Sequence, residues 1–298
     1  MNRWSSSLAA VTVAAAWTLC VAAPPAGSSD VPEGAARAAR AVRAVSPEPS
    51  AAAEGAFLGA YAPIEQPDEG AAARGREIMR GGRYLEEYTE LSNALLAIPQ
   101  DITVRAAQCG HANASYQQRR IVLCYEYAAE RERIFTEANA EKDATAPGST
   151  HDPVLADVEG AMLGTYFHEL GHAVIDVYDL PTTGNEEDAA DELAVLLLLA
   201  VDPSGDTTRS TLWAKKLAAR EEAGATPDYS DEHALSGQRY YNQLCMLYGS
   251  DQVKYAWIVS EEWLPERRAG RCDGEYQQAL HSWGQHLAGH WKKQPPQE

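Results

Sequence analysis

Two histidines separated by three residues, His168 and His172, lie in a stretch of chain that is otherwise strongly apolar. The 3.6-residue repeat of an α-helix places both imidazoles on one face, about one turn apart. Unpaired imidazoles are costly in apolar surroundings, so this pair needs a common partner. Asp152-Pro153 can start the helix and Leu180-Pro181 can stop it, which predicts a helix from Pro153 to about Val177 with two candidate metal ligands on it.

Glu169 completes the sequence His168-Glu-Leu-Gly-His172, an HExxH motif. Its carboxylate is placed to touch a water molecule on a bound metal ion and to act as a general base. Gly171 lowers the helix propensity by up to about 1 kcal/mol relative to alanine. A glycine is tolerable at this position if another element packs closely against it.

A third candidate ligand follows after a short turn. Asn185 can cap a helix that begins at Glu186, and Glu187 and Asp191 then lie one turn apart on one face. Catalytic zinc takes three protein ligands, so Glu187 can complete a His-His-Glu site, and Asp191 can accept the free N–H of a ligand histidine. Glu186 is the alternative ligand if the helix has another register. Acidic residues in a first helical turn also stabilise the helix dipole without any metal.

The N-terminus has the layout of a secretory signal peptide, which we expect at residues 1–23. Arg3 precedes an apolar run from Leu8 to Ala23 that ends in small residues. An uncleaved membrane anchor is the alternative, but the run is short for a bilayer span. Residues 24–55 are rich in Ala, Pro and Arg and predict a flexible tether. We therefore expect a single domain at 56–298 that is secreted or periplasmic, with no stable membrane insertion after signal cleavage.

Charge and cysteine content restrict the partners and the compartment. The chain has 25 Lys and Arg against 43 Asp and Glu, a net charge of −18, which excludes a phosphate-binding surface for nucleic acid.

Apart from Cys20 in the signal segment, an even number of cysteines in an oxidising compartment predicts two disulfides with three possible pairings. The local pairs are favoured over free buried thiols, and they are Cys109–Cys124 and Cys245–Cys272.

The remaining pattern predicts an α+β fold, because a few strands are followed by many helices. Short strands are expected at 102–107 and 120–125, with a turn at 109–116 between them. Helices are expected at 71–96 with a break at Gly81-Gly82, and at 126–142, 207–222, 232–248 and 275–290.

An HExxH sequence followed on a second helix by Glu-x-x-Ala-Asp resembles the gluzincin clan of zinc metallopeptidases. The chain is more closely similar to a secreted family described as putative metallopeptidases, which was first defined as a domain of unknown function. The resemblance covers roughly Tyr84 to Trp283. The matching segments are Cys109–Tyr116, Ile121–Glu126, His168–His172, Leu180-Pro181, Glu186–Asp191, Gln238–Asn242 with Cys245, Tyr248-Gly249, Leu264-Pro265 and Cys272.

This resemblance implies a zincin-like fold, with a small β-sheet packed on the HExxH helix and a mostly helical C-terminal part. It also implies one Zn²⁺ ion, with Glu169 as the base and Asp191 as the carboxylate that orients a ligand. The zinc ligands that it implies are His168, His172 and Glu187.

The resemblance further suggests residues that contact the substrate. Gluzincins often have an Asn-Ala pair on an edge strand that binds the substrate backbone, and Asn113-Ala114 is the candidate here. The same Asn113 also begins an Asn-Ala-Ser glycosylation sequon, or it can simply form a turn. Peptide hydrolysis builds negative charge on the carbonyl oxygen. His233 and then Arg239, expected on one helix, are the candidates to stabilise that charge.

A zinc hydrolase acting on a peptide or protein is the function that the resemblance implies. One alternative is a non-catalytic binding protein whose zinc only ties two helices together. Such a closed site needs a fourth ligand, for which His111, His151 and His233 are available. Another alternative is a zinc amidase that acts on a non-peptide or cell-wall substrate.

Overall fold

The computed structural model describes residues 55–65, 70–140, 153–202 and 204–292. The expected signal peptide at 1–23 and all but the last residue of the expected tether at 24–55 lie outside the described residues. Asp152, the expected start of the HExxH helix, and His151, a candidate fourth ligand, also lie outside them.

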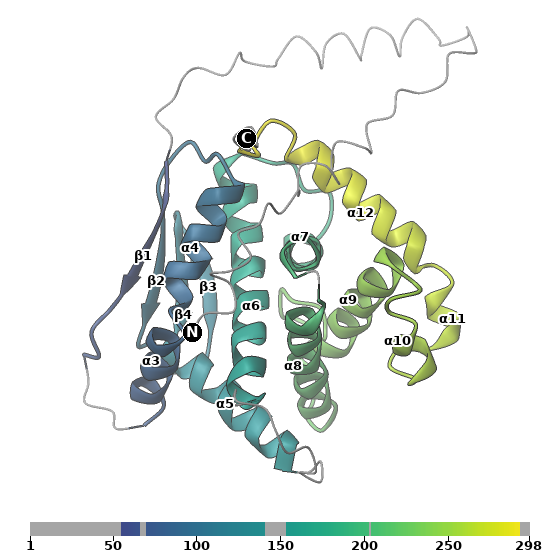
Figure 1. Ribbon diagram of the computed structural model, residues 1–298, viewed down its shortest axis with the longest axis horizontal. Helices are drawn as coiled ribbons and strands as arrows, with labels where there is room; N and C mark the ends of the chain where they lie inside the picture. Colours follow the sequence, from purple (N-terminus) through teal and green to yellow (C-terminus); the bar gives the residue numbers. More distant parts are fainter. Residues whose placement is uncertain (1–54, 66–69, 141–152, 203, 293–298) are drawn as a thin grey trace, which may run out of the picture.

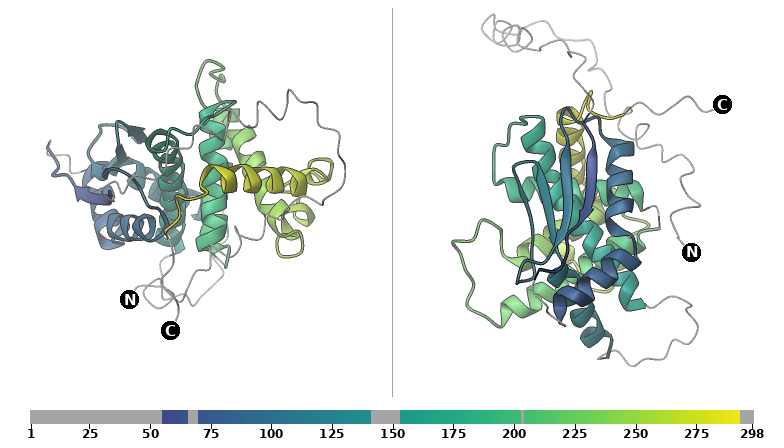
Figure 2. Two further views of the ribbon diagram at one scale, coloured as in Figure 1. Left: turned by 90° about the horizontal axis from the view of Figure 1, so that it is seen from above. Right: turned by 90° about the vertical axis from the view of Figure 1, so that its left-hand side faces the viewer.

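A four-stranded mixed sheet forms one side of the molecule (Figure 1). Its strands are β1 (Phe57–Tyr61), β2 (Ile102–Ala107), β3 (Ala114–Gln117) and β4 (Arg120–Cys124), in the spatial order β1-β2-β4-β3. The first three strands in that order are parallel, and β3 pairs antiparallel with β4 at the edge. Burial alternates along β2 because successive side chains point to opposite faces. The described helices cover one face, and the right-hand view of Figure 2 looks onto the other.

Apart from these strands, the regular secondary structure of the described residues is helical, so the α+β prediction is confirmed. The expected break at Gly81-Gly82 divides the segment 71–96 into two helices, since the first ends at Gly81 and Arg83 before the second adopts a left-handed conformation with φ of 56°. The helices are α3 (Ala71–Gly81), α4 (Tyr84–Leu95), α5 (Tyr125–Ala140), α6 (Pro153–Val177), α7 (Glu186–Val201), α8 (Asp206–Ala223), α9 (Ser236–Ser250), α10 (Trp257–Ser260), α11 (Glu266–Ala269) and α12 (Cys272–His286).

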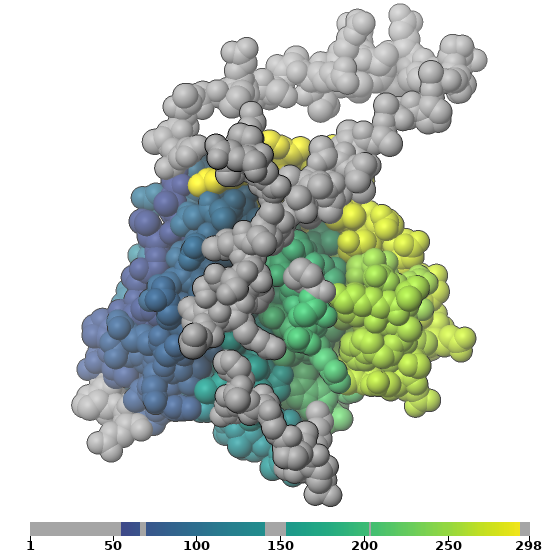
Figure 3. Space-filling model, viewed as in Figure 1, coloured from purple at the N-terminus to yellow at the C-terminus, as the bar shows by residue number. Residues whose placement is uncertain are grey.

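Helix α6 lies at the centre, between the sheet with α3–α5 and the C-terminal helices (Figure 1). The same division is visible on the surface in Figure 3, with N-terminal residues on one side and C-terminal residues on the other. Three glycines of α6 allow its neighbours to approach. A Cβ added at Gly160 or Gly164 would meet Ser210 or Thr211 of α8, and one added at Gly171 would lie 2.9 Å from the Cα of Ala190 in α7.

The expected bounds of two helices differ from the structure. The helix expected at 275–290 is α12, which runs from Cys272 to His286. The segment expected at 232–248 begins at Ser236, so His233 precedes α9 instead of lying on it. The Asp231 side chain accepts a hydrogen bond from the backbone N–H of His233, at 2.8 Å, which holds these residues in a turn. The side chain of Gln238 reaches back to the N–H of Leu235 and caps the helix there.

Two disulfides brace the fold, and they are the local pairs that the spacing favoured. Cys109–Cys124 joins the loop after β2 to the end of β4, and Cys245–Cys272 joins α9 to the start of α12. Such bonds indicate an oxidising, extracytoplasmic environment. None of the helices in the described part of the chain combines the length and the apolarity that a bilayer crossing requires.

Candidate metal centre

Two neighbouring helices bring three possible ligands together. His168 and His172 project from one face of α6, and their ring centroids lie 4.9 Å apart. Glu187 comes from the first turn of α7. Ligand atoms of these three side chains all lie within 4.8 Å of one another. The sequence predicted these three residues, and the tertiary structure places them in one cluster.

Local sequence explains why α7 presents Glu187 at this point. The Asn185 side chain accepts a hydrogen bond from the backbone N–H of Glu187 at 3.1 Å, so the helix begins one residue before the carboxylate. Gly171 then lets Ala190 approach α6 at close contact distance. As a result, Glu187 Oε2 lies 3.0 Å from His168 Nε2 and 3.3 Å from His172 Nε2.

The chemistry of these donors fits a cation. His233 adds a third ring nitrogen, with its Nε2 2.9 Å from the same Glu187 Oε2. This oxygen is buried, yet among the described residues it has no hydrogen bond of normal geometry. Imidazole nitrogens and a carboxylate oxygen that converge without hydrogen-bond geometry are a donor set that zinc uses. The residues present therefore fit a metal site.

Carboxylates hold the other nitrogen of both α6 histidines. Asp191 Oδ1 lies 3.0 Å from His168 Nδ1, and Glu186 Oε1 lies 2.7 Å from His172 Nδ1. Such partners orient ligand imidazoles and select the tautomer that binds metal. Sequence reasoning placed Asp191 in this role but considered Glu186 only as an alternative ligand. The sequence signal for the contact with His172 was the position of Glu186 directly before Glu187.

The electrostatics of the cluster follow from burial and from these neighbours. Glu169 is 6% exposed, and this burial raises its pKa above the ordinary value. Burial alone would also raise the pKa of Glu187, but the three imidazoles around it lower the pKa below its ordinary value. For Asp191, burial is likewise outweighed by the charges of Lys215 and Arg239, which lower the pKa well below its ordinary value.

His233 and Arg239 occupy different places around the cluster. His233 is 37% exposed and is not part of the group whose ligand atoms all lie within 4.8 Å of one another. Arg239 is largely buried and bonds Asp191 through two nitrogens, Nε at 2.6 Å and Nη2 at 2.8 Å. His233 thus lies beside the possible ligand Glu187, whereas Arg239 contacts Asp191, the carboxylate next to His168.

Asn113 and Ala114 lie at the edge strand of the sheet. Ala114 begins β3 and pairs with Leu123, and the Asn113 carbonyl accepts a hydrogen bond from the N–H of Cys124 at 3.1 Å. Strand β3 packs against α6, and Tyr116 of β3 donates a hydrogen bond to Asp176. His111 is a separate case, because it lies in the preceding loop and is absent from the ligand cluster of the described residues.

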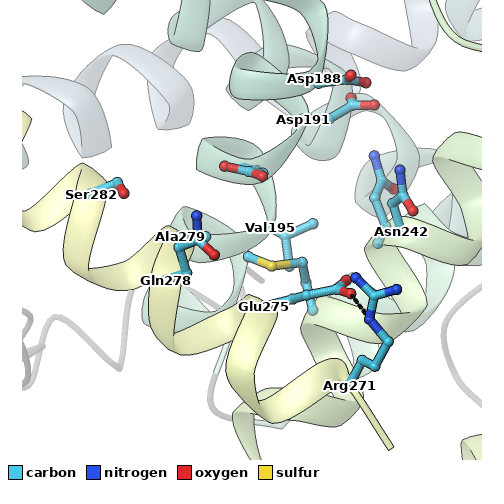
Figure 4. Close-up of a pocket in the computed structure, with 12 residues that line it drawn as sticks. Asp188, Asp191, Val195, Asn242, Arg271, Glu275, Gln278, Ala279 and Ser282 are labelled. Atoms are coloured by element: carbon cyan, nitrogen blue, oxygen red, sulfur yellow. Dashed lines mark ion pairs between the residues drawn. The ribbon is translucent and has the colours of Figure 1, made fainter. Parts of the chain in front are cut away.

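Asp191 also lines a cavity of about 290 Å³ between α7, α9 and α12 (Figure 4). Most charged residues around this cavity are acidic, including Asp188, Glu192 and Glu275. Arg271 is the cation there, and it forms an ion pair with Glu275 at 3.4 Å.

The chain matches a known protein family. A family model described as putative metallopeptidase matches residues 61–287, which include α6, α7 and α9. Comparison with curated proteins and with solved structures finds no match.

Proposed function

The chain belongs to the putative metallopeptidase family, and from this premise we propose that it is a zinc-dependent peptidase of the gluzincin type. The observation that carries the proposal is the convergence of His168, His172 and Glu187 beside the buried carboxylate of Glu169. These four side chains come from two helices whose close approach depends on Gly171.

His168, His172 and Glu187 would hold one Zn²⁺ ion. A bound zinc lowers the pKa of a water ligand towards about 7 and polarises a carbonyl group. Glu186 accepts the Nδ1–H of His172, and Asp191 lies 3.0 Å from Nδ1 of His168, so both Nε2 atoms would be left for the ion.

Glu169 acts as the general base in this proposal. It follows His168 directly on α6, and it accepts the proton of the water that attacks the peptide carbonyl. It then passes this proton to the leaving amine, so that one carboxylate serves both halves of the reaction. Its burial limits exchange of that proton with bulk solvent.

Three further residues are assigned to substrate in the same proposal. His233 lies beside the ligand cluster and is accessible, so it can donate a hydrogen bond to the carbonyl oxygen as negative charge develops there. Asn113 and Ala114 bind the substrate backbone at the edge strand. We assign Arg239 a positioning role, because its bonds to Asp191 hold the carboxylate that orients His168.

The proposal extends to the organisation and location of the chain. Residues 1–23 act as a signal peptide, 24–55 as a tether and 56–298 as the peptidase domain. The protein then works in the secreted or periplasmic space on peptide or protein substrates, which agrees with its two disulfides.

A structural zinc site is a second candidate, because His233 lies 2.9 Å from Glu187 and could serve as a fourth ligand. Four protein ligands would close the site and leave no position for water. In that case the protein would bind zinc without hydrolysing peptides.

Metal analysis and one substitution test the peptidase proposal. We expect one zinc per chain and cleavage of a mixed peptide library by the purified protein. Glu169→Gln should retain the zinc and lose at least about a hundredfold in kcat/KM, since it removes the base. The matched control is Glu87→Gln in α4, a half-buried carboxylate whose pKa burial raises to about 7 and which lies away from the cluster. Full activity in Glu169→Gln would refute the mechanism.

A zinc-binding inhibitor separates the two candidates. If the site is open, a hydroxamate binds the zinc-loaded protein, and His233→Ala lowers turnover while zinc affinity is retained. If His233 is the fourth ligand, the hydroxamate does not bind and His233→Ala lowers the zinc affinity instead. Calorimetry and zinc competition titration measure both quantities.

A further inference from the structure

A second cavity, of about 220 Å³, lies between α5, α6, α8 and α9. Helices α5 and α8 both pack against α6, and α9 packs against α8. All of the charged residues that line this cavity are cations, namely Arg131, Lys215 and Arg239. That is unexpected in a chain with 25 basic and 43 acidic residues, and it contrasts with the acidic cavity of Figure 4.

The cavity lies along the face of α6 that carries the two histidines. Ala161 and Thr165 line it, and they share a helical stripe with His168. At a rise of 1.5 Å per residue, Thr165 and Ala161 precede His168 by roughly 5 and 10 Å along the helix axis. An extended peptide spans about 3.3–3.6 Å per residue. A group in this cavity would therefore belong to a substrate residue within about three positions of the bond that is cleaved.

Arg131 has a donor without a partner in the cavity wall. The residue is 8% exposed, and its Nε has no hydrogen-bond partner among the described residues. Its Nη2 bonds Glu130 at 2.6 Å, and its guanidinium stacks over the ring of Tyr127, which also lines the cavity. A buried N–H group without an acceptor costs free energy, and a ligand oxygen would recover it.

Of the three cations that line this cavity, Lys215 has the fewest interactions that balance its charge. It is partly buried, and no hydrogen bond or ion pair joins it to a residue in the described ranges. Its burial lowers its pKa to about 8. Asp191 is the main favourable charge nearby, but the oxygens of that carboxylate already bond Arg239.

Neutral donors complete the lining. The hydroxyl groups of Tyr127 and Thr165 share a hydrogen bond of 3.1 Å, and both residues line the cavity together with Ser236. Cationic nitrogens with adjacent hydroxyl groups are the donor set that a carboxylate prefers.

We propose that this cavity binds a substrate carboxylate, so that the enzyme selects peptides with an acidic group close to the bond that is cleaved. The group is the side chain of Asp or Glu or the free C-terminus of the peptide. This inference rests on the proposed peptidase function, because the cavity is placed relative to the metal ligands. The overall charge of −18 repels acidic peptides at long range, so this selectivity comes from the cavity alone.

Paired peptides test the proposal with the zinc-loaded wild-type protein. A library digest first locates the cleavage site, and each flanking Glu is then compared with Gln in otherwise identical peptides. We expect kcat/KM at one flanking position to be about tenfold or more higher for Glu, the effect of a charge-assisted hydrogen bond. A parallel pair with a free or amidated C-terminus shows whether the terminal carboxylate is the group bound. Equal rates in all pairs would overturn the proposal.

A substitution then assigns the effect to the cavity. Lys215→Met should bring the Glu-to-Gln ratio close to one in protein that is saturated with zinc. The ratio compares two peptides on the same variant, so any loss of activity through Asp191, which lies near Lys215, affects both peptides equally. Lys216→Met is the matched control, because Lys216 is the next residue of α8 and does not line the cavity. A Lys215→Met protein that keeps the wild-type ratio would contradict the assignment.

A binding measurement separates this proposal from the peptidase proposal. If the wild-type protein cleaves no peptide, the peptidase proposal fails. Calorimetry with zinc-loaded Glu169→Gln still compares Glu and Gln peptides in that case. Tighter binding of the Glu peptide supports the carboxylate site, and equal affinity overturns it.

Discussion

The contact between Gly171 and Ala190 should control metal affinity. In Gly171→Ala the new Cβ would lie 2.9 Å from the Cα and 3.0 Å from the Cβ of Ala190, whereas ordinary contacts are 3.4–4 Å. Helix α7 must therefore move away by about 0.5–1 Å, since the atoms that it meets belong to the backbone and a short side chain. Metal–ligand distances tolerate only about ±0.2 Å. Glu187, one turn from Ala190, would then no longer fit the ion held by the histidines.

The magnitudes separate the effect on the site from the effect on the fold. Overpacking costs about 1–3 kcal/mol, and replacing a helical glycine by alanine returns up to about 1 kcal/mol. We expect a net loss of about 0–3 kcal/mol in the free energy of unfolding. The zinc affinity should fall about 10- to 100-fold, the range found when groups that orient ligands are lost.

Zinc competition against a chromophoric chelator measures the affinity, and urea denaturation of the metal-free protein measures the stability. The control is Gly274→Ala in α12, where nothing lies within 4 Å of the added Cβ. This control should bind zinc like the wild type and be equally or more stable. Wild-type zinc affinity in Gly171→Ala would refute the argument that this helix contact sets the ligand geometry.

Further predictions concern the metal and its support. Asp191→Asn should lower zinc affinity about 10- to 100-fold by the same titration, because it weakens the contacts to His168 and Arg239. Zinc at 100 times its dissociation constant should stabilise the wild type by about 2.7 kcal/mol, and chelation should abolish this gain in thermal unfolding. Replacing Cys109 and Cys124 with serine opens a loop with a sequence separation of 15 and should remove about 3 kcal/mol in urea denaturation.

Features that depend on neighbouring residues could be predicted from the sequence. The strand at Ile102–Ala107 has the expected bounds because its side chains alternate between core and surface. The HExxH helix ends at Val177 as expected, and the Asn185 cap starts α7 at Glu186 as expected. Helical spacing likewise placed His168 with His172, and Glu187 with Asp191.

Features that depend on distant segments were predicted only in part. His233 was expected on a helix with Arg239, but a local side-chain bond from Asp231 keeps it in a turn before α9. This turn lets His233 reach Glu187 while Arg239 bonds Asp191. The contact of Glu186 with His172 was missed because it depends on how α7 crosses α6.

The sequence by itself therefore determined which side chains share a helix face, because helix geometry is set by bonds within about one turn. Only the tertiary structure decided which faces meet. That outcome depends on the close packing of α7 and α8 against the glycines of α6, and on the segment that brings His233 back to the cluster. The cation-lined cavity is the clearest case, since its three charges come from α5, α8 and α9 and share no local pattern.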